Sequence, residues 1–422
     1  MDRVVLVGAP HRTASRDLVD EHLEELSRLT DTAGGNVVGK LVQRIDAPNP
    51  AYYLGEGKAR ELAELVASTE ADLVVFDEEL SPAQGKNLEE IVGVRVMDRS
   101  EIILDIFATR ARSREARMQV ELAQLQYLLP RLRRMWSHLS RIRGGIGLRG
   151  PGETQLETDR RLIGTRIADL RSKLKDVAKA RAQQRKSREG SFRVALVGYT
   201  NAGKSSLLRT LSGSELFVED RLFATLDSAT RSVDLGSGYE ALLTDTVGFI
   251  RKLPHHLVAS FRSTLEEARE ADVLLHVIDA SHSDWREHHQ VVSEVLHDLG
   301  LDGRDQILVF NKIDRITHEE EEMLRARVRS LDATPAVFVS ALDADTHDAL
   351  RDTLLTRVRG RLASVVVSVP VVDGETIAAI YREGEVTGRS DDSMRVSLTA
   401  RIPVALLGRL TGRRDVSVQE VA

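Results

Sequence analysis

Residues 198 to 205 read Gly198-Tyr199-Thr200-Asn201-Ala202-Gly203-Lys204-Ser205, and this stretch decides the fold of the centre of the chain. A strand-like run, Val194–Val197, precedes it, and a helical pattern opens at Ser206. In this context the spacing is that of a P-loop, whose backbone N–H groups and following helix N-terminus cradle phosphates. Lys204 is expected to reach the outer phosphates and Ser205 to bind Mg²⁺. The stretch therefore predicts a nucleotide site.

Strand-like runs alternate with helical stretches around this P-loop. The runs are Val194–Val197, Ser232–Leu235, Ala241–Thr244, Val273–Ile278, Ile307–Phe310 and Ala336–Val339. Alternation of this kind predicts an α/β fold with a doubly wound sheet. We expect this P-loop domain to span residues 192–360.

The identity of the base is predicted by Asn311-Lys312-Ile313-Asp314, which follows the run Ile307–Phe310. An Asp carboxylate at this place can accept hydrogen bonds from N1–H and the N2 amino group of guanine, whereas adenine would present an acceptor to it. The residues Val339, Ser340 and Ala341 are expected to complete the base-side loop through backbone contacts. The ligand is therefore predicted to be GTP or GDP.

Two segments between these motifs are expected to sense the γ-phosphate. The first is Phe223-Ala224-Thr225-Leu226-Asp227, in which Thr225 would close over Mg²⁺ together with Ser205. The second is Asp245-Thr246-Val247-Gly248, in which Asp245 orients the metal shell and the Gly248 N–H donates to the γ-phosphate. Because these contacts exist only with a triphosphate, both segments are predicted to be switches that order on binding and release on hydrolysis.

Phe249 stands where well-known small GTPases carry a glutamine that orients the attacking water. A phenylalanine side chain cannot form the hydrogen bonds that orient a water molecule. We therefore predict slow intrinsic hydrolysis that accelerates when a partner docks. The predicted catalytic set is Lys204, Thr225, Gly248 and the position of Phe249.

The composition excludes several function classes. A chain of 422 residues is expected to form about two to four domains, and 42% hydrophobic with 29% charged residues is typical of a soluble globular protein. We see no apolar stretch long enough for a membrane span and no signal-peptide pattern, and we expect a cytoplasmic protein. The absence of cysteine excludes disulfides, thiolate zinc sites and thiol catalysis, so any metal is expected to be bound by oxygen.

Three further domains are predicted around the P-loop domain. In residues 1–108, the runs Val4–Val7, Val37–Val42, Leu73–Phe76 and Val94–Met97 alternate with helical patterns, which indicates a small α/β domain with a mainly parallel sheet. Residues 109–191 carry two apolar seams of alternating four and three spacing, from Met118 to Leu139 and from Ile163 to Val177, which indicate a long antiparallel helical hairpin. Residues 361–422 combine β-rich runs with a short helix and predict a small α+β domain.

The hairpin is basic in an otherwise acidic chain. Residues 109–190 hold 21 Lys and Arg against 8 Asp and Glu, a balance of +13 within a total of −6. Its glycine-rich stretch, residues 143–157, is too rich in helix breakers to continue a helix and predicts a projecting tip loop. A concentrated basic segment favours a polyanionic partner, nucleic acid above all, although a solvated helical face is the alternative.

The wording of these motifs resembles the HflX family of ribosome-associated GTPases. The resemblance is carried by residues 198–205, 223–227 and 245–250 and by the run Gly150-Pro-Gly-Glu-Thr-Gln-Leu-Glu-Thr-Asp-Arg-Arg161, and it extends over residues 53–58, 76–82, 104–107 and 120–130. Members of this family carry a hydrophobic residue where Phe249 stands. The hairpin tip differs from many relatives in carrying Arg141-Ile-Arg143 before the glycines.

The resemblance implies a partner and an activity. It implies that the N-terminal domain binds the large (50S) ribosomal subunit, that residues 109–190 contact ribosomal RNA, and that the tip loop is directed toward the peptidyl-transferase centre. It also implies splitting of stalled or idle 70S ribosomes into subunits under stress, with hydrolysis stimulated by ribosomes. We expect the protein to be monomeric.

Two other functions stay open at this stage. One is a regulatory switch that binds a protein effector and no RNA, and the other is a GTP-dependent RNA-binding module without ribosome-splitting activity. The segment Gly55-Glu-Gly57-Lys58 predicts a turn before a helix, and the sequence contains no second P-loop for ATP in the N-terminal half. The pairs His255–His256 and His288–His289 lack the carboxylate spacing of a metal site and are expected to face solvent.

Overall fold

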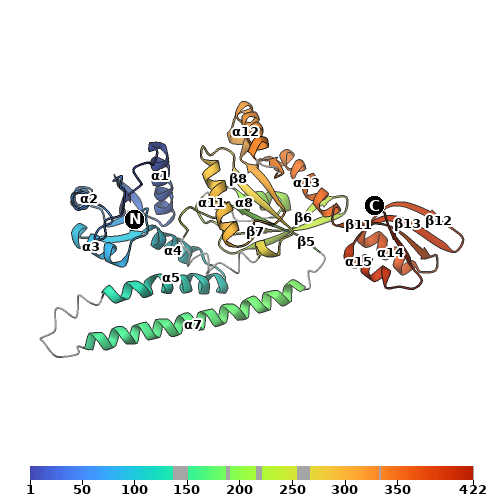
Figure 1. Cartoon of the computed structure of the whole chain (residues 1–422), viewed down its shortest axis with the longest axis horizontal. Coiled ribbons are helices and arrows are strands. Elements are labelled where there is room, and N and C mark those ends of the chain that lie inside the picture. The colour runs from blue at the N-terminus through green and yellow to red at the C-terminus, as the bar shows by residue number, and fades with distance from the viewer. Residues whose placement is uncertain (136–150, 187–190, 215–220, 254–266, 332–333, 422) are drawn as a thin grey trace.

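The computed structural model describes residues 1–135, 151–186, 191–214, 221–253, 267–331 and 334–421. The chain forms an N-terminal α/β unit, a helical hairpin, a central α/β unit and a C-terminal antiparallel unit, arranged in chain order (Figure 1). The predicted fold class is therefore confirmed.

The N-terminal unit is a parallel four-stranded sheet of order β2-β1-β3-β4. Its elements are β1 (Arg3–Gly8), α1 (Arg16–Thr32), β2 (Asn36–Val42), α2 (Glu56–Ser68), β3 (Leu73–Phe76), α3 (Pro82–Val92), β4 (Arg95–Asp98) and α4 (Arg99–Arg110). The start of α1 is fixed by Ser15, whose hydroxyl accepts the backbone N–H of Leu18. Turn by turn, α1 then buries Val19, Leu23 and Leu26 on one face. This packing leaves the polar face of α1 available to the central unit.

The hairpin consists of α5 (Arg114–Met135) and α7 (Pro151–Lys186), which run antiparallel (Figure 1). The predicted seam forms where Met118 and Leu122 pack against Ile167 and Leu170. The expected tip loop is too long by seven residues, because α7 already begins at Pro151, a residue whose fixed φ and missing N–H suit the first helical turn. The rest of the tip, with Trp136 and Leu139 of the expected seam, lies outside the described residues.

A second apolar face of α5 was not predicted. Ala116, Val120, Ala123 and Tyr127 are buried in the same core as Phe107 of α4. The predicted boundary between residues 108 and 109 falls inside α4, so this helix joins the N-terminal unit to the hairpin without a linker. Helix α5 therefore packs between α4 and α7, and the hairpin is rooted in the N-terminal unit.

The central unit has a six-stranded sheet of order β10-β9-β8-β5-β7-β6, in which only β6 is antiparallel to its neighbour. Its elements are β5 (Phe192–Gly198), α8 (Lys204–Ser212), β6 (Ala229–Gly236), β7 (Tyr239–Asp245), β8 (Val273–Asp279), α11 (Trp285–Asp298), β9 (Gln306–Asn311), α12 (His318–Leu331), β10 (Ala336–Phe338) and α13 (Asp348–Arg359). The strand order reverses at β5, and ligands of doubly wound sheets bind at the carboxyl ends of the strands beside such a point.

The C-terminal unit is an antiparallel sheet of order β12-β13-β11-β14. It comprises β11 (Leu362–Pro370), α14 (Gly374–Glu383), β12 (Glu385–Asp391), β13 (Arg395–Pro403), α15 (Val404–Thr411) and β14 (Ser417–Glu420). The two β-rich runs expected there correspond to β11 and β13, whereas β12, β14 and α15 were not expected.

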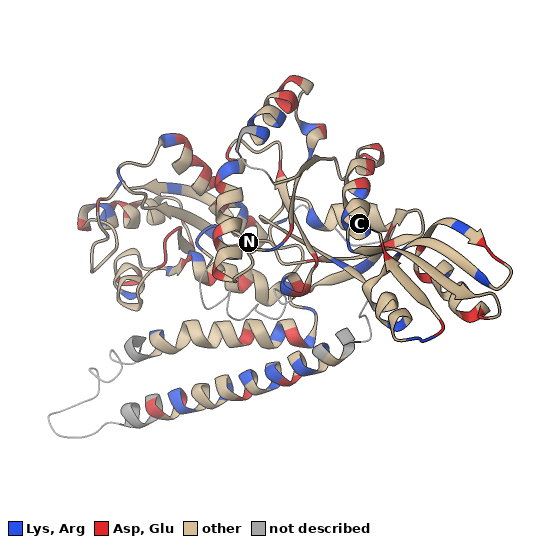
Figure 2. Cartoon of the chain, turned by 45° about the vertical axis from the view of Figure 1, so that its right-hand side comes forward, with Lys and Arg blue, Asp and Glu red and all other residues tan. Residues whose placement is uncertain are grey.

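Charges along the hairpin are mixed rather than uniformly basic (Figure 2). Arg166 reaches across from α7 to Glu121 of α5 at 2.6 Å, and Arg181 reaches Glu115 at 2.7 Å. Arg171 and Lys175, one turn apart on α7, are exposed. Part of the positive charge thus holds the two helices together, and part of it faces solvent. Among the described residues, no helix is both long and apolar enough to cross a membrane.

Candidate functional site

The loops at the carboxyl end of the central sheet enclose a cleft of about 400 Å³. It is lined by Thr200, Asn201, Gly203, Lys204, Ser205, Ser206, Arg221, Phe223, Ala224, Thr225, Thr246 and Gly248. The cleft thus brings together the P-loop and parts of both expected switches. The sequence analysis did not predict that Arg221 lines the cleft. Its position four residues before Thr225, in the approach to the first expected switch, was the available signal.

Two glycines of the P-loop are required by its backbone path. Gly198 has a φ of 153° and Gly203 a φ of 94°, a region that residues with side chains rarely adopt. A Cβ on Gly203 would lie 2.2 Å from Nδ2 of Asn311, and one on Gly198 would lie 2.3 Å from the carbonyl oxygen of Val277. The loop can pack against the ends of β8 and β9 only because these side chains are absent.

Lys204 is buried beneath the loop as the first residue of α8, two residues earlier than the expected helix start. Its Nζ donates to the carbonyl oxygens of Gly198 at 3.1 Å and Tyr199 at 2.9 Å. Burial lowers the pKa of Lys204 to about 8. Gly248 lies beside it, since a Cβ there would be 3.1 Å from Nζ. The ammonium and the Gly248 backbone therefore approach the same point of the cleft.

Asn311 connects the P-loop with the base-side loop. Its Nδ2 donates to the carbonyl oxygen of Ala202 at 2.9 Å, and its Oδ1 accepts the N–H of Ala341 at 2.9 Å. Oδ1 of Asp314 accepts from the Ser340 hydroxyl at 2.5 Å, which orients the carboxylate. Lys312 Nζ lies 2.6 Å from Asp279 Oδ2, and the Val339 N–H donates to Phe310. The structure thus brings the expected base-side residues together.

Ser205, Thr225 and Asp245 form an oxygen-rich group at the floor of the cleft. The Ser205 hydroxyl donates to Asp245 Oδ2 at 2.5 Å and lies 2.6 Å from the Thr225 hydroxyl. Burial raises the pKa of Asp245, and its Oδ1 has no hydrogen-bond partner among the described residues. A buried carboxylate oxygen beside two hydroxyls fits a hard divalent cation such as Mg²⁺.

Only part of the first expected switch lines the cleft. The N–H of Phe223 donates to the Thr200 hydroxyl at 2.9 Å, and its ring packs edge-on against Phe107 at 4.6 Å between centroids. Leu226 is buried in the core. Asp227 was expected to lie at the nucleotide but does not line the cleft. Its carboxylate accepts hydrogen bonds from the backbone N–H groups of Arg112, at 3.2 Å, and Ser113, at 3.0 Å, and from the Ser113 hydroxyl.

This role of Asp227 follows from helix chemistry. The Ser113 hydroxyl caps α5 by accepting the backbone N–H of Ala116 at 3.0 Å, and the Asp227 carboxylate, which binds Ser113, also meets the positive end of the helix dipole. Asp227 accepts at the two residues that directly precede α5. The switch segment is therefore bonded to the start of the hairpin.

Phe249 is buried, and its backbone pairs with the P-loop. Its N–H donates to the Gly198 carbonyl oxygen at 3.1 Å, and its carbonyl oxygen accepts the Thr200 N–H at 2.6 Å. The ring belongs to the core that also holds Phe107 and Phe223. This side chain does not line the cleft and offers no hydrogen-bonding group to water.

The segment after Phe249 enters the N-terminal unit through Arg251. Arg251 Nη2 lies 2.6 Å from Asp77 Oδ1, and its Nε lies 2.8 Å from Glu25 Oε1. Arg99 binds the same two carboxylates, with Nη1 2.9 Å from Asp77. All four side chains are nearly or fully buried. The sequence analysis did not predict this network. The only hint near the nucleotide motifs is Arg251, three residues after Gly248.

Tyr199 of the P-loop joins the same network. Its hydroxyl donates to Glu25 and accepts the Arg251 N–H at 3.0 Å. Burial raises the pKa of Asp77 and Glu25, but the charges of Arg99 and Arg251 outweigh burial and hold both pKa values below their ordinary range. The N-terminal unit thus contacts the P-loop and the second switch directly.

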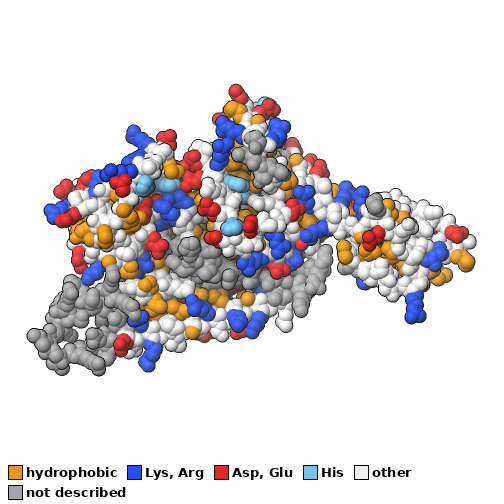
Figure 3. Space-filling model, viewed as in Figure 1, with side chains coloured by type: hydrophobic (Ala, Val, Ile, Leu, Met, Phe, Trp, Pro, Cys, Tyr) orange, Lys and Arg blue, Asp and Glu red, His pale blue; other side chains and the backbone are white. Residues whose placement is uncertain are grey.

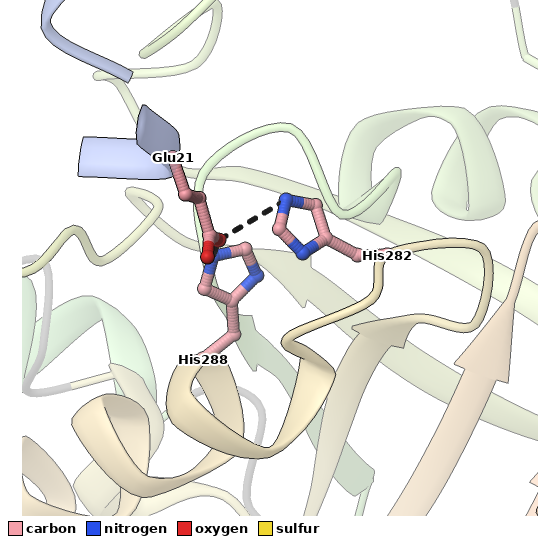
Figure 4. Close-up of side chains that lie close together, drawn as sticks. All are labelled: Glu21, His282 and His288. Carbon is pink, nitrogen blue, oxygen red and sulfur yellow. Dashed lines mark ion pairs between the residues drawn. The ribbon is translucent and has the colours of Figure 1, made fainter. Parts of the chain in front are cut away.

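The expectation that His288 and His289 face solvent is wrong. The His288 ring stacks on Tyr199 at 3.8 Å, and the His289 ring stacks on His276 at 4.9 Å. His288 also lies near His282 and Glu21, so that a carboxylate and two imidazoles meet between α1 and α11 (Figure 4). Residues 255 and 256 lie outside the described residues.

Comparison with known proteins identifies the family of this chain. Family models match residues 20–108 (GTP-binding GTPase N-terminal), 110–188 (GTP-binding GTPase middle region) and 193–312 (50S ribosome-binding GTPase). GTPase HflX of Magnetococcus marinus is 43% identical over 99% of this chain and 97% of its own. GTPase HflX of Escherichia coli is 42% identical over 97% of this chain and 95% of its own. The chain belongs to the HflX family of GTPases.

As an HflX-family protein the chain is a GTP-hydrolysing enzyme that binds GTP and GDP, and the family resemblance expected from the sequence is confirmed. Among solved structures, the crystal structure of the SsGBP and GDP complex is 26% identical, with a TM-score of 0.47 over 84% of this chain and 98% of that chain.

Proposed function

We propose that this HflX-family GTPase binds the large ribosomal subunit and splits stalled or idle 70S ribosomes into subunits, in the cytoplasm and under stress. The support is the basic hairpin. The two residues that precede its helix α5, Arg112 and Ser113, donate hydrogen bonds to Asp227 of the first expected switch. The family model over residues 193–312 carries the description 50S ribosome-binding GTPase. In this proposal the protein acts as a monomer made of the domains 1–108, 109–191, 192–360 and 361–422.

The observation that carries the proposal is the contact between Asp227 and the residues preceding α5. Thr225 is expected to move onto Mg²⁺ when a γ-phosphate is present, and Asp227 is only two residues away. A shift of this segment would weaken the hydrogen bonds that Asp227 accepts from Arg112 and Ser113. Phe223, which packs on Phe107 of α4, would move with it. The state of the nucleotide would thus reach the root of the hairpin by two short contacts.

The proposed roles at the nucleotide follow the geometry of the cleft. Ser205 and Thr225 bind Mg²⁺, with Asp245 orienting its shell, while Lys204 and the Gly248 N–H contact the γ-phosphate. Mg²⁺ supplies charge neutralisation at the β- and γ-phosphates. Asp314 reads guanine, and Asn311 holds the two loops in place. The remaining proposed contacts come from the backbone of residues 198–203, 223–226, 246–247 and 339–341.

Slow intrinsic hydrolysis follows from Phe249 and Arg251. The side chain of Phe249 cannot orient water, and Arg251 holds the second switch in a buried ion-pair network with the N-terminal unit. A ribosome that engages the N-terminal unit could release this segment and supply the water-positioning group. We propose that hydrolysis is therefore stimulated by ribosomes.

The proposed RNA surface is the solvent side of residues 109–190. Arg171 and Lys175 are exposed there, on the face of α7 that does not meet α5. Flexible cations on a helix can follow a phosphate backbone, and such binding weakens strongly with salt. The tip of the hairpin is proposed to approach the peptidyl-transferase centre.

Sedimentation of 70S ribosomes with this protein tests the proposal. We expect free subunits with GTP and with a non-hydrolysable analogue, and intact 70S ribosomes with GDP. Lys204→Ala, which removes the phosphate-binding ammonium, serves as the nucleotide-binding control and should leave ribosomes intact. Co-sedimentation without dissociation would instead support an RNA-binding module, and failure to sediment in every nucleotide state would support a switch for a protein effector.

A further inference from the structure

Three potential metal ligands from two units of the protein meet beside the P-loop. Glu21 lies on α1, His282 in the loop between β8 and α11, and His288 on α11 (Figure 4). Their three ligand atoms lie within 4.8 Å of one another. Glu21 Oε1 is 3.5 Å from His282 Nε2 and 3.9 Å from His288 Nε2. Ligands of one tetrahedral ion are about 3.3–3.5 Å apart at metal–ligand bonds near 2.1 Å, so a small contraction would suffice.

The carboxylate of Glu21 has one oxygen without a partner. Its Oε2 is buried and has no hydrogen-bond partner among the described residues. A buried acceptor without a donor is costly, and a bound cation would satisfy it.

The two imidazoles are the other donors of this group. A neutral imidazole offers a lone pair, the form in which histidine binds metals. The side chains of Glu21, His282 and His288 are each about one-fifth exposed. They line a second pocket, beside the nucleotide cleft, from which an ion can reach them.

We infer that Glu21, His282 and His288 bind one divalent transition-metal ion that joins the N-terminal unit to the central unit. Mixed nitrogen and oxygen donors, with one position left open, suit Zn²⁺ and its neighbours, whereas Mg²⁺ prefers oxygen alone. This site is separate from the Ser205–Thr225 group, and it differs from the oxygen-only metal site that the sequence predicts.

Binding requires one local rearrangement. His282 Nδ1 accepts the Asp284 N–H at 3.2 Å, which leaves the proton of the neutral ring on Nε2, the atom nearer Glu21. A metal at Nε2 moves this proton to Nδ1, and the bond from Asp284 is then lost. The lost bond is a weak one within a loop, and the metal–ligand bonds replace it.

The consequence is a clamp beside the nucleotide. His288 stacks on Tyr199, whose hydroxyl is bonded to Glu25 one turn along α1 from Glu21. Histidine side chains are visible near the junction of the two units in Figure 3. An ion at this point would hold α1 against α11 and oppose any separation of the N-terminal unit from the P-loop.

Titration of nucleotide-free full-length protein with Zn²⁺, in competition with a chromophoric chelator, tests this inference. We expect one ion per chain, and affinity lower by about tenfold or more in His282→Asn, His288→Asn and Glu21→Gln, since each removes one of few ligands. His297→Gln and His318→Gln, which change exposed histidines elsewhere, serve as matched controls and should bind as the parent does. The double variant His255→Gln/His256→Gln should also bind normally.

A spectroscopic measurement separates a built site from loose binding. Co²⁺ should give the intense visible absorption of four-fold nitrogen and oxygen coordination in the parent protein, and His288→Asn should lose it. Zn²⁺ should also raise the Tm of the parent and of the exposed-histidine controls but not that of His288→Asn. Unchanged Zn²⁺ affinity in His282→Asn and His288→Asn, or loss of binding only in the His255/His256 double variant, would overturn the inference.

Discussion

In the proposed function, guanine specificity rests on the single carboxylate of Asp314. The Ser340 hydroxyl holds Asp314 in orientation, and Asn311 fixes the surrounding loop against the P-loop. A buried acceptor that loses its donors is costly, and this asymmetry makes specificity strong.

Asp314→Asn should therefore exchange one base preference for another. The amide can donate to the C2 carbonyl oxygen of xanthine, but it meets the N2 amino group of guanine with a donor. We expect GTP affinity to fall by about 100-fold or more and xanthosine triphosphate to bind better than GTP. Competition against a fluorescent GDP analogue measures both. Asp302→Asn, an exposed aspartate in another loop, is the control, and equal GTP affinity in Asp314→Asn would contradict the assignment.

At the scale of elements, the informative contact is the one between the first switch and α5. The Phe223 ring packs on Phe107, and Asp227 binds the residues that precede α5, so the chain flanking Thr225 contacts both the cleft and the root of the hairpin. Such a segment can transmit the exchange of GDP for GTP only if its contacts with α4 and the start of α5 weaken as its contacts with the nucleotide form.

Asp227→Ala should loosen the start of α5 and disconnect it from the nucleotide. Asp227 holds Ser113, whose hydroxyl caps α5 at Ala116, so its loss should weaken this cap and the first turn of α5 should exchange its amide hydrogens faster. We further expect the difference between GTP-bound and GDP-bound protein in this turn to disappear. Ser15→Ala, which removes the cap of α1, is the matched control and should affect α1 alone. Unchanged exchange around residues 113–118 would speak against the coupling.

The elements themselves could largely be predicted from the sequence. The four N-terminal strands and the six central strands were found because β-branched runs separated by helical patterns report burial locally. The second face of α5 was missed, because Ala116, Ala123 and Tyr127 acquire their apolar neighbours only when α4 packs on them. The start of α7 was missed because Gly152 argues against a helix, while Pro151 favours the first turn.

At the scale of the molecule, a buried ion-pair network joins the N-terminal and central units. Removing one member of such a network leaves an uncompensated buried charge, which costs about 3–5 kcal/mol. Asp77→Asn should thus lower stability at neutral pH and loosen the second switch.

The same network predicts a pH dependence. Asp77 and Glu25 have pKa values below their ordinary ones in the folded state, because Arg99 and Arg251 outweigh burial. Their stabilisation is present above the unfolded pKa values of about 4 and is lost as the pH falls below them. Thermal unfolding between pH 6 and 3 should show a fall in Tm toward acid that is smaller in Asp77→Asn. Asp31→Asn, which changes an exposed aspartate of α1, is the control. The assignment would be refuted if Tm fell equally steeply with pH in Asp77→Asn and in Asp31→Asn.

Charge reversal on the hairpin tests the proposed RNA surface. Arg171→Glu/Lys175→Glu should weaken ribosome binding and lower the slope of log affinity against log salt by about 1.5, as expected for two lost phosphate contacts. Hydrolysis without ribosomes should stay unchanged, because neither residue lines the cleft. Arg382→Glu, exposed on α14, controls for net charge. A salt slope equal to that of the parent would remove α7 from the interface.

The sequence alone determined the nucleotide chemistry. The P-loop, the guanine-reading tetrapeptide and the two switch segments are short contiguous motifs, so the atoms that act together are already close along the chain. The tertiary structure decided what those motifs are connected to. It assigned Asp227 to α5, placed Arg251 between Asp77 and Glu25, and brought Glu21 to His282 and His288. Such partners are separated by 100 residues or more, and only the packing of whole elements brings them into contact.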